Sequence, residues 1–194
     1  ISITIAVNFR AIGQLEETKF YHQKSIDMAE ELGNGPVQVM ALNGLGLIYR
    51  DQDSLTKAQD IFEKALKIAE ETDFLVGIAT QSRNLGVIAQ RRGKLSTAET
   101  YYDKALGIRM QIGAPLPIAG SYHDLGSLLI DLGRLDEAEE ILLKAASQFR
   151  ELKVWDSENA VRLLLANLYE KRNDAPKAVS YLTEYYEIED SIRS

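Results

Sequence analysis

The chain repeats itself with a period of 40 residues, and this repeat limits the possible folds more than any other feature. The dipeptide Leu-Gly occurs at positions 45–46, 85–86 and 125–126. The same register continues to Leu165-Ala166 and runs back to Ile5-Ala6, each a large apolar residue followed by a small one. Periods of about 20 to 50 residues are typical of proteins that stack equal supersecondary units. The sequence therefore predicts a stack of about five units, with the first and the last incomplete.

Small residues recur at two further places in each unit and indicate closely packed helices. The two series are Thr18, Ala58, Ala98, Ala138 and Ala178, and Ser25, Ala65, Ala105 and Ala145, followed by Tyr185 as a departure. Small side chains at fixed places on two helices let the backbones approach closely, as an antiparallel pair requires. We therefore expect an all-α fold in which each unit is a hairpin of two antiparallel helices.

Turn-forming residues separate the two expected helices of each unit. They begin the segments Gly13-Gln14-Leu15, Asp53-Ser54-Leu55, Gly93-Lys94-Leu95, Gly133-Arg134-Leu135 and Asn173-Asp174-Ala175. Gly and Asn tolerate the left-handed backbone found at helix ends. The stretches containing Gly33-Asn34-Gly35-Pro36 and Gly113-Ala114-Pro115 are expected to connect one hairpin to the next.

For the opening residues, the local sequence pattern and the repeat register predict different secondary structures. Ile1-Ser2-Ile3-Thr4-Ile5 alternates like a β-strand. The repeat register aligns these residues with the first helix of the other units, where Leu42, Leu45 and Tyr49 recur at helical spacing. We therefore expect a helix here.

The repeat resembles that of the tetratricopeptide family. The matching residues of the second unit are Leu42, Leu45, Gly46, Tyr49, Ala58, Phe62 and Ala65. The common unit of the family has about 34 residues, and the longer period here is similar to that of kinesin light chains, spindle-orientation adaptors and several bacterial regulatory receptors. The resemblance implies a right-handed superhelical solenoid with a concave groove that recognises peptides or protein segments.

The domain organisation follows from this register. We expect a single domain over residues 1–194, cut from a longer protein, with units at approximately 1–38, 39–78, 79–118, 119–158 and 159–194. Solenoid ends need polar capping surfaces. The apolar residues at the two ends therefore predict that further chain or self-association covers at least one of them; these residues are Ile1, Ile3, Ile5 and Val7, and Tyr181, Tyr185 and Ile188.

Composition excludes several functional classes. The chain has no cysteine, which removes thiolate chemistry and cysteine-ligated metal sites. Its formal charge of −7 disfavours general nucleic-acid binding, which depends on Lys and Arg at phosphates. No run approaches the roughly 18 consecutive apolar residues of a membrane span, and the start lacks the basic residues of a signal peptide. We expect a cytoplasmic protein with no nucleic-acid or membrane partner.

No residue pattern indicates catalysis, a metal site or a cofactor. The two histidines, His22 and His123, fall in different helices of different units, and His22 occupies the position of Phe62, which indicates helix packing. Asp51-Gln52-Asp53 lacks the further spaced ligands of a calcium loop and is expected to be a polar turn. We therefore predict a protein that is not an enzyme and that folds without a metal.

A stripe along the first helix of each hairpin is the predicted partner site. Positions i, i+4 and i+7 share one helix face, and the family resemblance places this face on the concave side. The predicted contacts are Asn43, Leu47, Arg50, Arg83, Val87, Gln90, His123, Ser127, Ile130 and Asn167. Arg83 is expected near the centre as an anchor for a carboxylate, because its guanidinium can donate two parallel hydrogen bonds.

The predicted function is binding of a protein or peptide segment, in an adaptor or a regulatory sensor. Chaperone-binding members of the family clamp a terminal carboxylate with Lys and Asn; the corresponding pairs here, Asn43 with Leu47 and Arg83 with Val87, do not reproduce that cluster. Two alternatives stay open. The chain could be a self-associating structural module, or a noncatalytic segment of a larger signalling enzyme.

Overall fold

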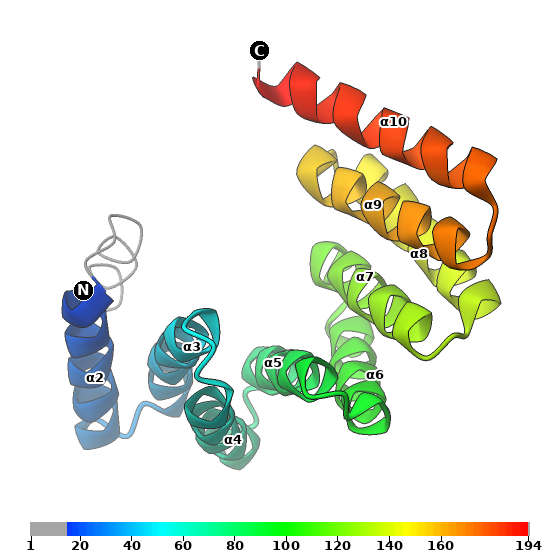
Figure 1. The fold of residues 1–194 in the computed structure, drawn as a ribbon. Helices are drawn as coiled ribbons and strands as arrows, with labels where there is room; N and C mark the ends of the chain where they lie inside the picture. Colours follow the sequence, from blue (N-terminus) through cyan, green and yellow to red (C-terminus); the bar gives the residue numbers. More distant parts are fainter. Residues whose placement is uncertain (1–14, 194) are drawn as a thin grey trace. The chain divides into compact units, whose positions relative to one another are not determined.

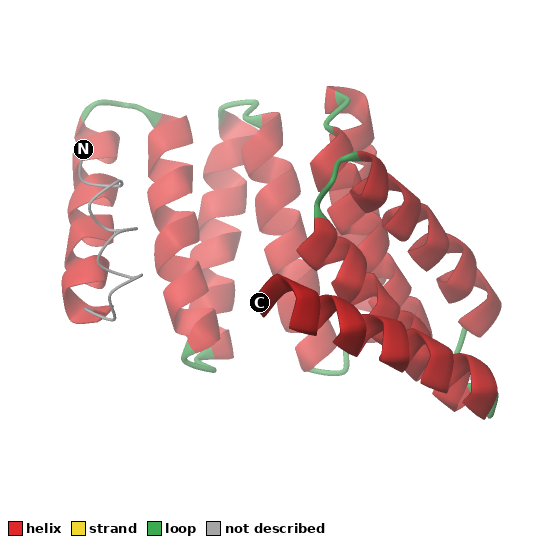
Figure 2. Cartoon of the chain, turned by 90° about the horizontal axis from the view of Figure 1, so that it is seen from above, coloured by secondary structure: helices red, strands yellow, loops and turns green. Residues whose placement is uncertain are grey.

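The computed structural model describes residues 15–193, and the regular structure in this range is entirely α-helical (Figure 2). The helices are α2 (Leu15–Glu31), α3 (Gly35–Asp51), α4 (Leu55–Glu71), α5 (Leu75–Arg91), α6 (Leu95–Ile112), α7 (Pro115–Asp131), α8 (Leu135–Glu151), α9 (Trp155–Lys171) and α10 (Ala175–Arg193). The predicted all-α solenoid of antiparallel hairpins is confirmed. The expected helix at Ile1–Ile5 and the expected turn at Gly13 lie outside the described residues.

By its contacts the chain divides into two compact units, which we call the N-terminal unit (residues 1–108) and the C-terminal unit (residues 109–194). In the N-terminal unit α2 packs on α3, α3 on α4 and α4 on α5 (Figure 1). In the C-terminal unit α7 packs on α8, α8 on α9 and α9 on α10. The first helices of successive hairpins also touch, α3 with α5 and α7 with α9. Each hairpin begins a few residues before the predicted unit start, because the first helix extends N-terminally to its turn.

The Leu-Gly pair of the repeat places a glycine against a large side chain of the second helix. A Cβ atom added to Gly46 would lie 2.4 Å from Phe62 Cε1, and one added to Gly126 would lie 2.4 Å from Leu142 Cδ2. Gly86 stands in the same relation to Tyr102, at 2.6 Å from the ring. These large side chains are buried. The glycine therefore lets the two helices of a hairpin approach until the side chain of one covers the backbone of the other.

Every described turn contains one residue with a left-handed backbone, spaced 20 residues apart along the chain. These residues are Gly33, Asp53, Asp73, Gly93, Gly113, Gly133, Lys153 and Asn173. After α3 the Ser54 N–H donates to the Tyr49 carbonyl oxygen at 2.9 Å and the Asp53 N–H donates to that of Arg50 at 3.0 Å, which is the Schellman arrangement. The predicted turns at 53, 93, 133 and 173 are confirmed.

Each unit has its own apolar core. The N-terminal unit has two clusters of buried side chains from α3, α4 and α5, one that includes Leu42 and one that includes Phe62 and Leu85. In the C-terminal unit Leu142 and Leu165 lie at the centre of a cluster that α7 to α10 share. Because these positions repeat with the 40-residue period, the burial of each hairpin depends mainly on its immediate neighbours.

Candidate binding groove

A cleft of about 320 Å³ runs between the first helices of two hairpins in the N-terminal unit. Its lining comes mainly from α3 and α5, whose backbones contact each other, and α2 contributes His22. We call this cleft the N-terminal groove. It is lined by His22, Val39, Met40, Asn43, Gly44, Leu47, Phe74, Val76, Gly77, Thr80 and Gln81.

The floor of the N-terminal groove carries a row of side-chain amides. Asn43 Oδ1 of α3 accepts hydrogen bonds from Asn84 Nδ2 of α5 at 2.8 Å and from Gln81 Nε2 of α5 at 3.4 Å. Gln81 is 1% exposed, and its Oε1 atom is buried with no hydrogen-bond partner among the described residues. Buried amide oxygens are normally paired. The floor of the groove therefore contains a buried acceptor that none of the described residues pairs with.

The rim of the N-terminal groove is apolar. Met40 and Val76 are 53% and 54% exposed, and Leu47 and Phe74 are half-buried behind them. None of the lining residues is an Asp, Glu, Lys or Arg. A largely apolar cleft with a few fixed polar groups is the usual character of a ligand site.

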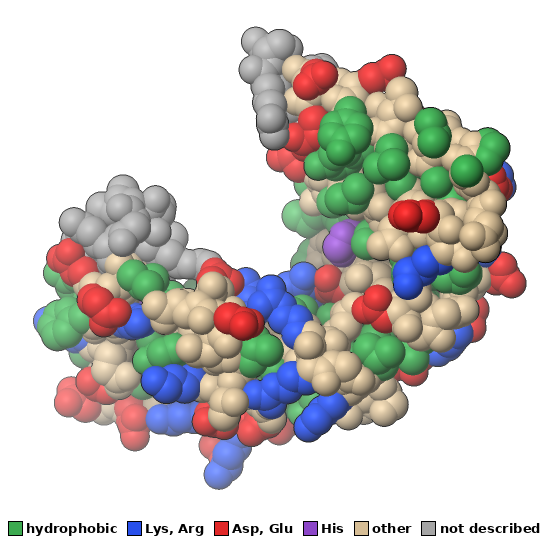
Figure 3. Space-filling model, viewed as in Figure 1, with side chains coloured by type: hydrophobic (Ala, Val, Ile, Leu, Met, Phe, Trp, Pro, Cys, Tyr) green, Lys and Arg blue, Asp and Glu red, His purple; other side chains and the backbone are tan. Residues whose placement is uncertain are grey.

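Six of the predicted contacts lie on α3 and α5 in the N-terminal unit. Asn43 and Leu47 line the groove itself. Arg50, Arg83, Val87 and Gln90 lie half-buried further along the same two helices. Arg50 pairs with Asp51 at 2.8 Å, and Gln90 Oε1 accepts from the Tyr102 hydroxyl at 2.9 Å. In the space-filling view, Lys and Arg side chains gather over the α3–α5 part of the chain (Figure 3).

The other four predicted contacts belong to the C-terminal unit. His123 and Ser127 are half-buried on α7, and Asn167 is exposed on α9. Ile130 is 3% exposed and belongs to the apolar core of the C-terminal unit. The side chain of an isoleucine has no polar group to desolvate when its neighbours cover it, whereas Arg50 and Gln90 at the equivalent places bond their polar ends to Asp51 and Tyr102.

A second cleft, of about 800 Å³, lies between α9 and α10. Its lining includes Leu163, Asn167, Glu170, Val179 and Leu182. Leu163 and Val179 are large apolar residues that are exposed, and hydrophobic side chains gather over α9 and α10 in the space-filling view (Figure 3). The sequence analysis missed Val179 and Leu182. The register contained a signal, because Leu182 stands where Phe62, Tyr102 and Leu142 are buried.

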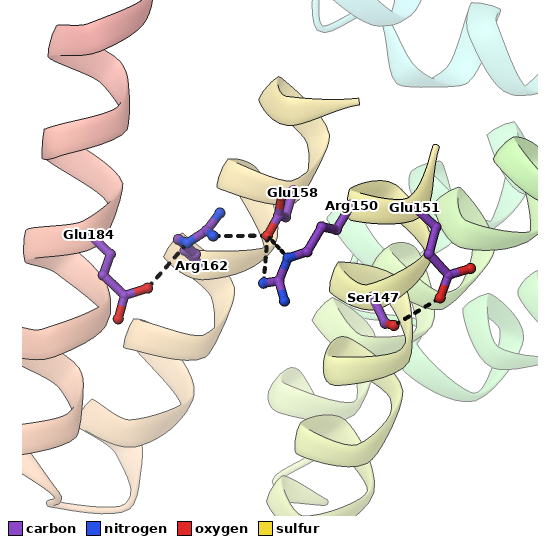
Figure 4. Close-up of polar contacts among 6 residues, drawn as sticks. All are labelled: Ser147, Arg150, Glu151, Glu158, Arg162 and Glu184. Atoms are coloured by element: carbon purple, nitrogen blue, oxygen red, sulfur yellow. Dashed lines mark hydrogen bonds and ion pairs between the residues drawn. The ribbon is translucent and has the colours of Figure 1, made fainter. Parts of the chain in front are cut away.

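The buried carboxylate of Glu158 is held by two arginines (Figure 4). Its Oε1 atom accepts from Arg150 Nε and Nη2 of α8 at 2.9 and 2.7 Å, and from Arg162 Nη2 of α9 at 2.8 Å. Arg162 Nε also donates to Glu184 of α10 at 3.3 Å. We call these four residues the Glu158 network. A charge this well paired links three helices and leaves no group poised for acid–base chemistry.

A second polar cluster joins α8 to the turn between α9 and α10. The Tyr169 hydroxyl and Arg172 both donate to Glu139, and Arg172 also pairs with Asp136. The hydrogen bond from Tyr169 and the charge of Arg172 hold the pKa of the Glu139 carboxyl below its usual value. Burial and the neighbouring Glu139 raise the pKa of the Tyr169 hydroxyl. We call these residues the Glu139 cluster.

The remaining candidate groups have packing roles or lie in turns. His22 is 2% exposed, and a Cβ added to Gly44 would lie 2.2 Å from its ring, which confirms the prediction that it packs helices. Asp53 lies in the turn after α3. Within residues 15–193, no three His, Asp or Glu side chains gather as a metal site requires. None of the helices described is both long and apolar enough to cross a membrane.

Comparison with known proteins identifies the repeat. A family model described as tetratricopeptide repeat matches residues 1–71 and 117–190, and a second model with the same description matches residues 79–110. No curated protein matches the chain in sequence.

Solved structures share the fold at low sequence identity. BtubC (BKLC) from P. vanneervenii is 21% identical with a TM-score of 0.83, over 97% of this chain and 78% of that one. A putative kinesin light chain with nearly identical repeats from Podosopora anserina is 17% identical with a TM-score of 0.77, over 100% and 95%. The Rap protein in complex with competence and sporulation factor is 15% identical with a TM-score of 0.75, over 99% and 64%. At these identities the likeness concerns the fold alone.

Proposed function

This chain belongs to the tetratricopeptide repeat family, and from this premise we propose that it is a noncatalytic interaction module. Its partner is a protein or peptide segment that binds in the N-terminal groove and along the exposed faces of α3 and α5. The proposed role is that of an adaptor or a regulatory sensor in the cytoplasm. The Rap protein, which has a similar fold, was solved in complex with competence and sporulation factor, and this supports a ligand-binding role for the present chain.

The observation that carries the proposal is the mixed chemistry of the groove. Exposed Met40 and Val76 offer apolar contact, while Asn43 and Gln81 offer hydrogen bonds at the floor. Exposed apolar side chains around a few fixed polar groups mark interaction sites more often than ordinary surface does.

Arg83 and Arg50 add positive charge beyond the groove, on α5 and α3. Both are half-buried, so a carboxylate that meets them is partly shielded from water and interacts more strongly than at an open surface. We therefore propose that the partner segment carries an acidic residue next to the part that enters the groove. His123, Ser127 and Asn167 are proposed as further contacts in the C-terminal unit.

The test is a charge reversal with a matched control. Partner segments are first captured through a photo-reactive amino acid placed at position 40, and the strongest segment is then synthesised. Arg83→Glu should weaken its binding by roughly 2 kcal/mol or more, since losing the partner of a partly buried charge is costly. Lys64→Glu makes the same change of charge on the exposed face of α4 and should leave the affinity unaltered. Equal affinities of the two variants would remove this assignment.

Self-association is the second candidate function, and the exposed face of α9 and α10 favours it. Leu163 and Val179 are exposed beside Leu182, which stands where Phe62, Tyr102 and Leu142 are buried in the other units. A chain that dimerises through this face should become monomeric in the Val179→Glu variant. Sedimentation equilibrium decides, because a wild-type chain that is monomeric at high concentration rules this function out. The third reading, a noncatalytic segment of a larger signalling enzyme, is compatible with either mode of binding.

A further inference from the structure

We propose that the N-terminal groove selects an uncharged apolar side chain of an extended peptide segment, and that Gln81 accepts a hydrogen bond from a backbone N–H next to that side chain. This inference rests on the proposed function and specifies the chemistry of its ligand.

The first step of the argument is the unmet acceptor in the groove. Gln81 Nε2 points to Asn43 Oδ1, so the carbonyl end of the same amide points away from that contact. This Oε1 atom is buried and has no partner among the described residues, although Gln81 lines the cleft. Leaving a buried acceptor unpaired is unfavourable. A ligand that brings a donor to this atom therefore removes a penalty that the protein otherwise bears.

The second step is the donor capacity of Asn43. Both hydrogen bonds found at this residue end on its oxygen. Neither uses the two N–H donors of the Asn43 amide, which is half-buried on the other wall of the groove. The groove thus presents an acceptor on α5 and a donor on α3. An extended peptide offers the complementary pair, a backbone N–H and a backbone carbonyl, at every residue.

The third step excludes charged side chains from the cleft. The lining contains no Asp, Glu, Lys or Arg, and its outer part is formed by Met40, Leu47, Phe74 and Val76. A charged group entering this cleft would lose hydration and meet no opposite charge. The volume of about 320 Å³ lies at the small end of ligand sites, which begin at about 300 Å³. The groove therefore fits one or two apolar side chains.

The experiment begins with a phage library of random twelve-residue peptides selected on the full chain. Enriched peptides should share an uncharged apolar residue at one position, and the strongest peptide is synthesised for calorimetry. Met40→Glu, which places a charge at the rim, should weaken its binding about tenfold, since the charge loses hydration in the complex. Met110→Glu is the matched control, because Met110 is 56% exposed and lies outside the groove.

The role of Gln81 is tested by methylating the peptide backbone one nitrogen at a time. One N-methyl group, next to the apolar residue, should lower the affinity for the wild-type chain about tenfold by removing the donor. The same group should have little further effect on the Gln81→Leu variant, whose folding is checked by circular dichroism. Met40→Glu keeps the inference testable if Gln81→Leu does not fold.

The outcomes separate the two proposals. Peptides whose binding responds to Arg83→Glu but not to Met40→Glu or to any N-methyl group would overturn this inference and leave the proposed function standing. A library that yields no binding peptide would count against the proposed function and this inference together.

Discussion

Glycines on the first helices have opposite roles that depend only on what lies across from each one. Gly126 faces Leu142, whose Cδ2 and Cγ atoms would lie 2.4 and 2.5 Å from an added Cβ. Gly120 is in the same helix, α7, and an added Cβ would meet nothing within 4 Å. One glycine is required by packing, and the other only weakens its helix.

These two glycines give a matched pair of predictions. Gly126→Ala should destabilise the protein by about 1–3 kcal/mol, because the added methyl overpacks the hairpin. Gly120→Ala should stabilise it by about 0.5–1 kcal/mol, because alanine restricts the unfolded chain and favours the helix. Urea unfolding followed by circular dichroism measures both. A change of the same sign in the two variants would contradict the assignment of Gly126 to the helix contact.

The Glu139 cluster predicts how stability responds to pH. The folded-state pKa of Glu139 is lowered by Tyr169 and Arg172. Its contribution is therefore present above the unfolded pKa of about 4.3 and is lost as the pH falls through the folded pKa. Glu139→Gln should flatten the loss of stability at acidic pH, as measured by urea unfolding between neutral and acidic buffers.

Tyr169 predicts the opposite dependence on the alkaline side. Its folded-state pKa is raised by burial and by Glu139, so its contribution is present below the unfolded pKa of about 10 and is lost as the pH rises through the folded pKa. Tyr169→Phe should flatten the alkaline loss of stability. It should also reduce the acid response, since it removes the hydrogen bond that Glu139 accepts. Curves for the wild type and the variant that stay parallel at all pH values would refute the coupling.

At the scale of the elements, each described turn contains a residue with a left-handed backbone, and these residues recur every 20 positions. Glycine occupies four of these described positions, and Asp53, Asp73, Lys153 and Asn173 occupy the others. Lysine has no side-chain group that eases this conformation, unlike Asp and Asn. Among the described turns, the one after α8 therefore has the left-handed residue whose side chain favours this conformation least.

Lys153→Gly should stabilise the protein by about 0.5–1 kcal/mol. Removing the strain of the left-handed backbone should gain more free energy than is lost through the greater conformational entropy of glycine in the unfolded state. Gly133→Ala, in open space with a φ of +74°, should destabilise it through the backbone alone. Thermal melts of both variants provide the measurement. A lower melting temperature for Lys153→Gly would mean that its side-chain contacts outweigh the strain.

A contact joins the last turn of each hairpin to the first helix of the next one. It occurs at the same repeat position in different units, but the side chains that form it differ. Gln38 Nε2 donates to Glu30 Oε2 at 3.2 Å between α2 and α3, and Arg150 pairs with Glu158 at the same register between α8 and α9. Between α4 and α5 the equivalent residue is the apolar Ile78, which joins the core. The repeat fixes the place of this contact and leaves its chemistry variable.

The Glu158 network predicts nonadditive effects of its two arginines. Arg150→Met alone should cost little, because the Arg150 side chain is 64% exposed and Arg162 still holds the carboxylate. The double variant Arg150→Met/Arg162→Met leaves a buried carboxylate unpaired and should cost about 3 kcal/mol or more. A double-mutant cycle by urea unfolding measures the coupling between the two arginines. Strictly additive costs would show that the carboxylate is solvated.

At the scale of the whole molecule, the described helices bury their apolar surface chiefly against the helices next to them in the chain. The cores around Phe62 and around Leu142 lie in different units. Stability in such a protein is approximately a sum over repeats and their interfaces. Perturbations are therefore expected to stay local.

Hydrogen exchange of the Gly126→Ala variant tests this expectation. Amide protection should fall most in α7 and α8 and less in their neighbour α9, while α3 and α4 keep wild-type protection. The matched experiment uses Gly46→Ala, whose added Cβ meets Phe62, and should reverse the pattern. An even loss of protection over all described helices would indicate one cooperative core.

Part of the candidate groove could be predicted from the sequence. Asn43 and Leu47 were found because the stripe at i, i+4 and i+7 follows from helix geometry alone. Met40, Val76 and Gln81 were missed, since the rim and floor of the groove combine residues of α2, α3 and α5 that no single helix face contains. Helix periodicity also put Ile130 on this face, although it is buried, because periodicity defines a face but does not say how closely a neighbouring helix covers its end.

The repeat in the sequence was enough to predict the class of fold, the number and order of helices in the described part and the place of most turns, those at Asp73 and Lys153 excepted. It could do so because these features depend on local backbone preferences and on a spacing repeated several times along the chain. Which side chains stay exposed and which polar atoms find partners became clear only from the packing of the helices. Gln81 and Glu158 illustrate the reason: both are buried polar residues on first helices, yet one keeps an unpaired acceptor and the other is held by two arginines. That difference depends on side chains brought together from separate helices, and a repeat spacing carries no information about them.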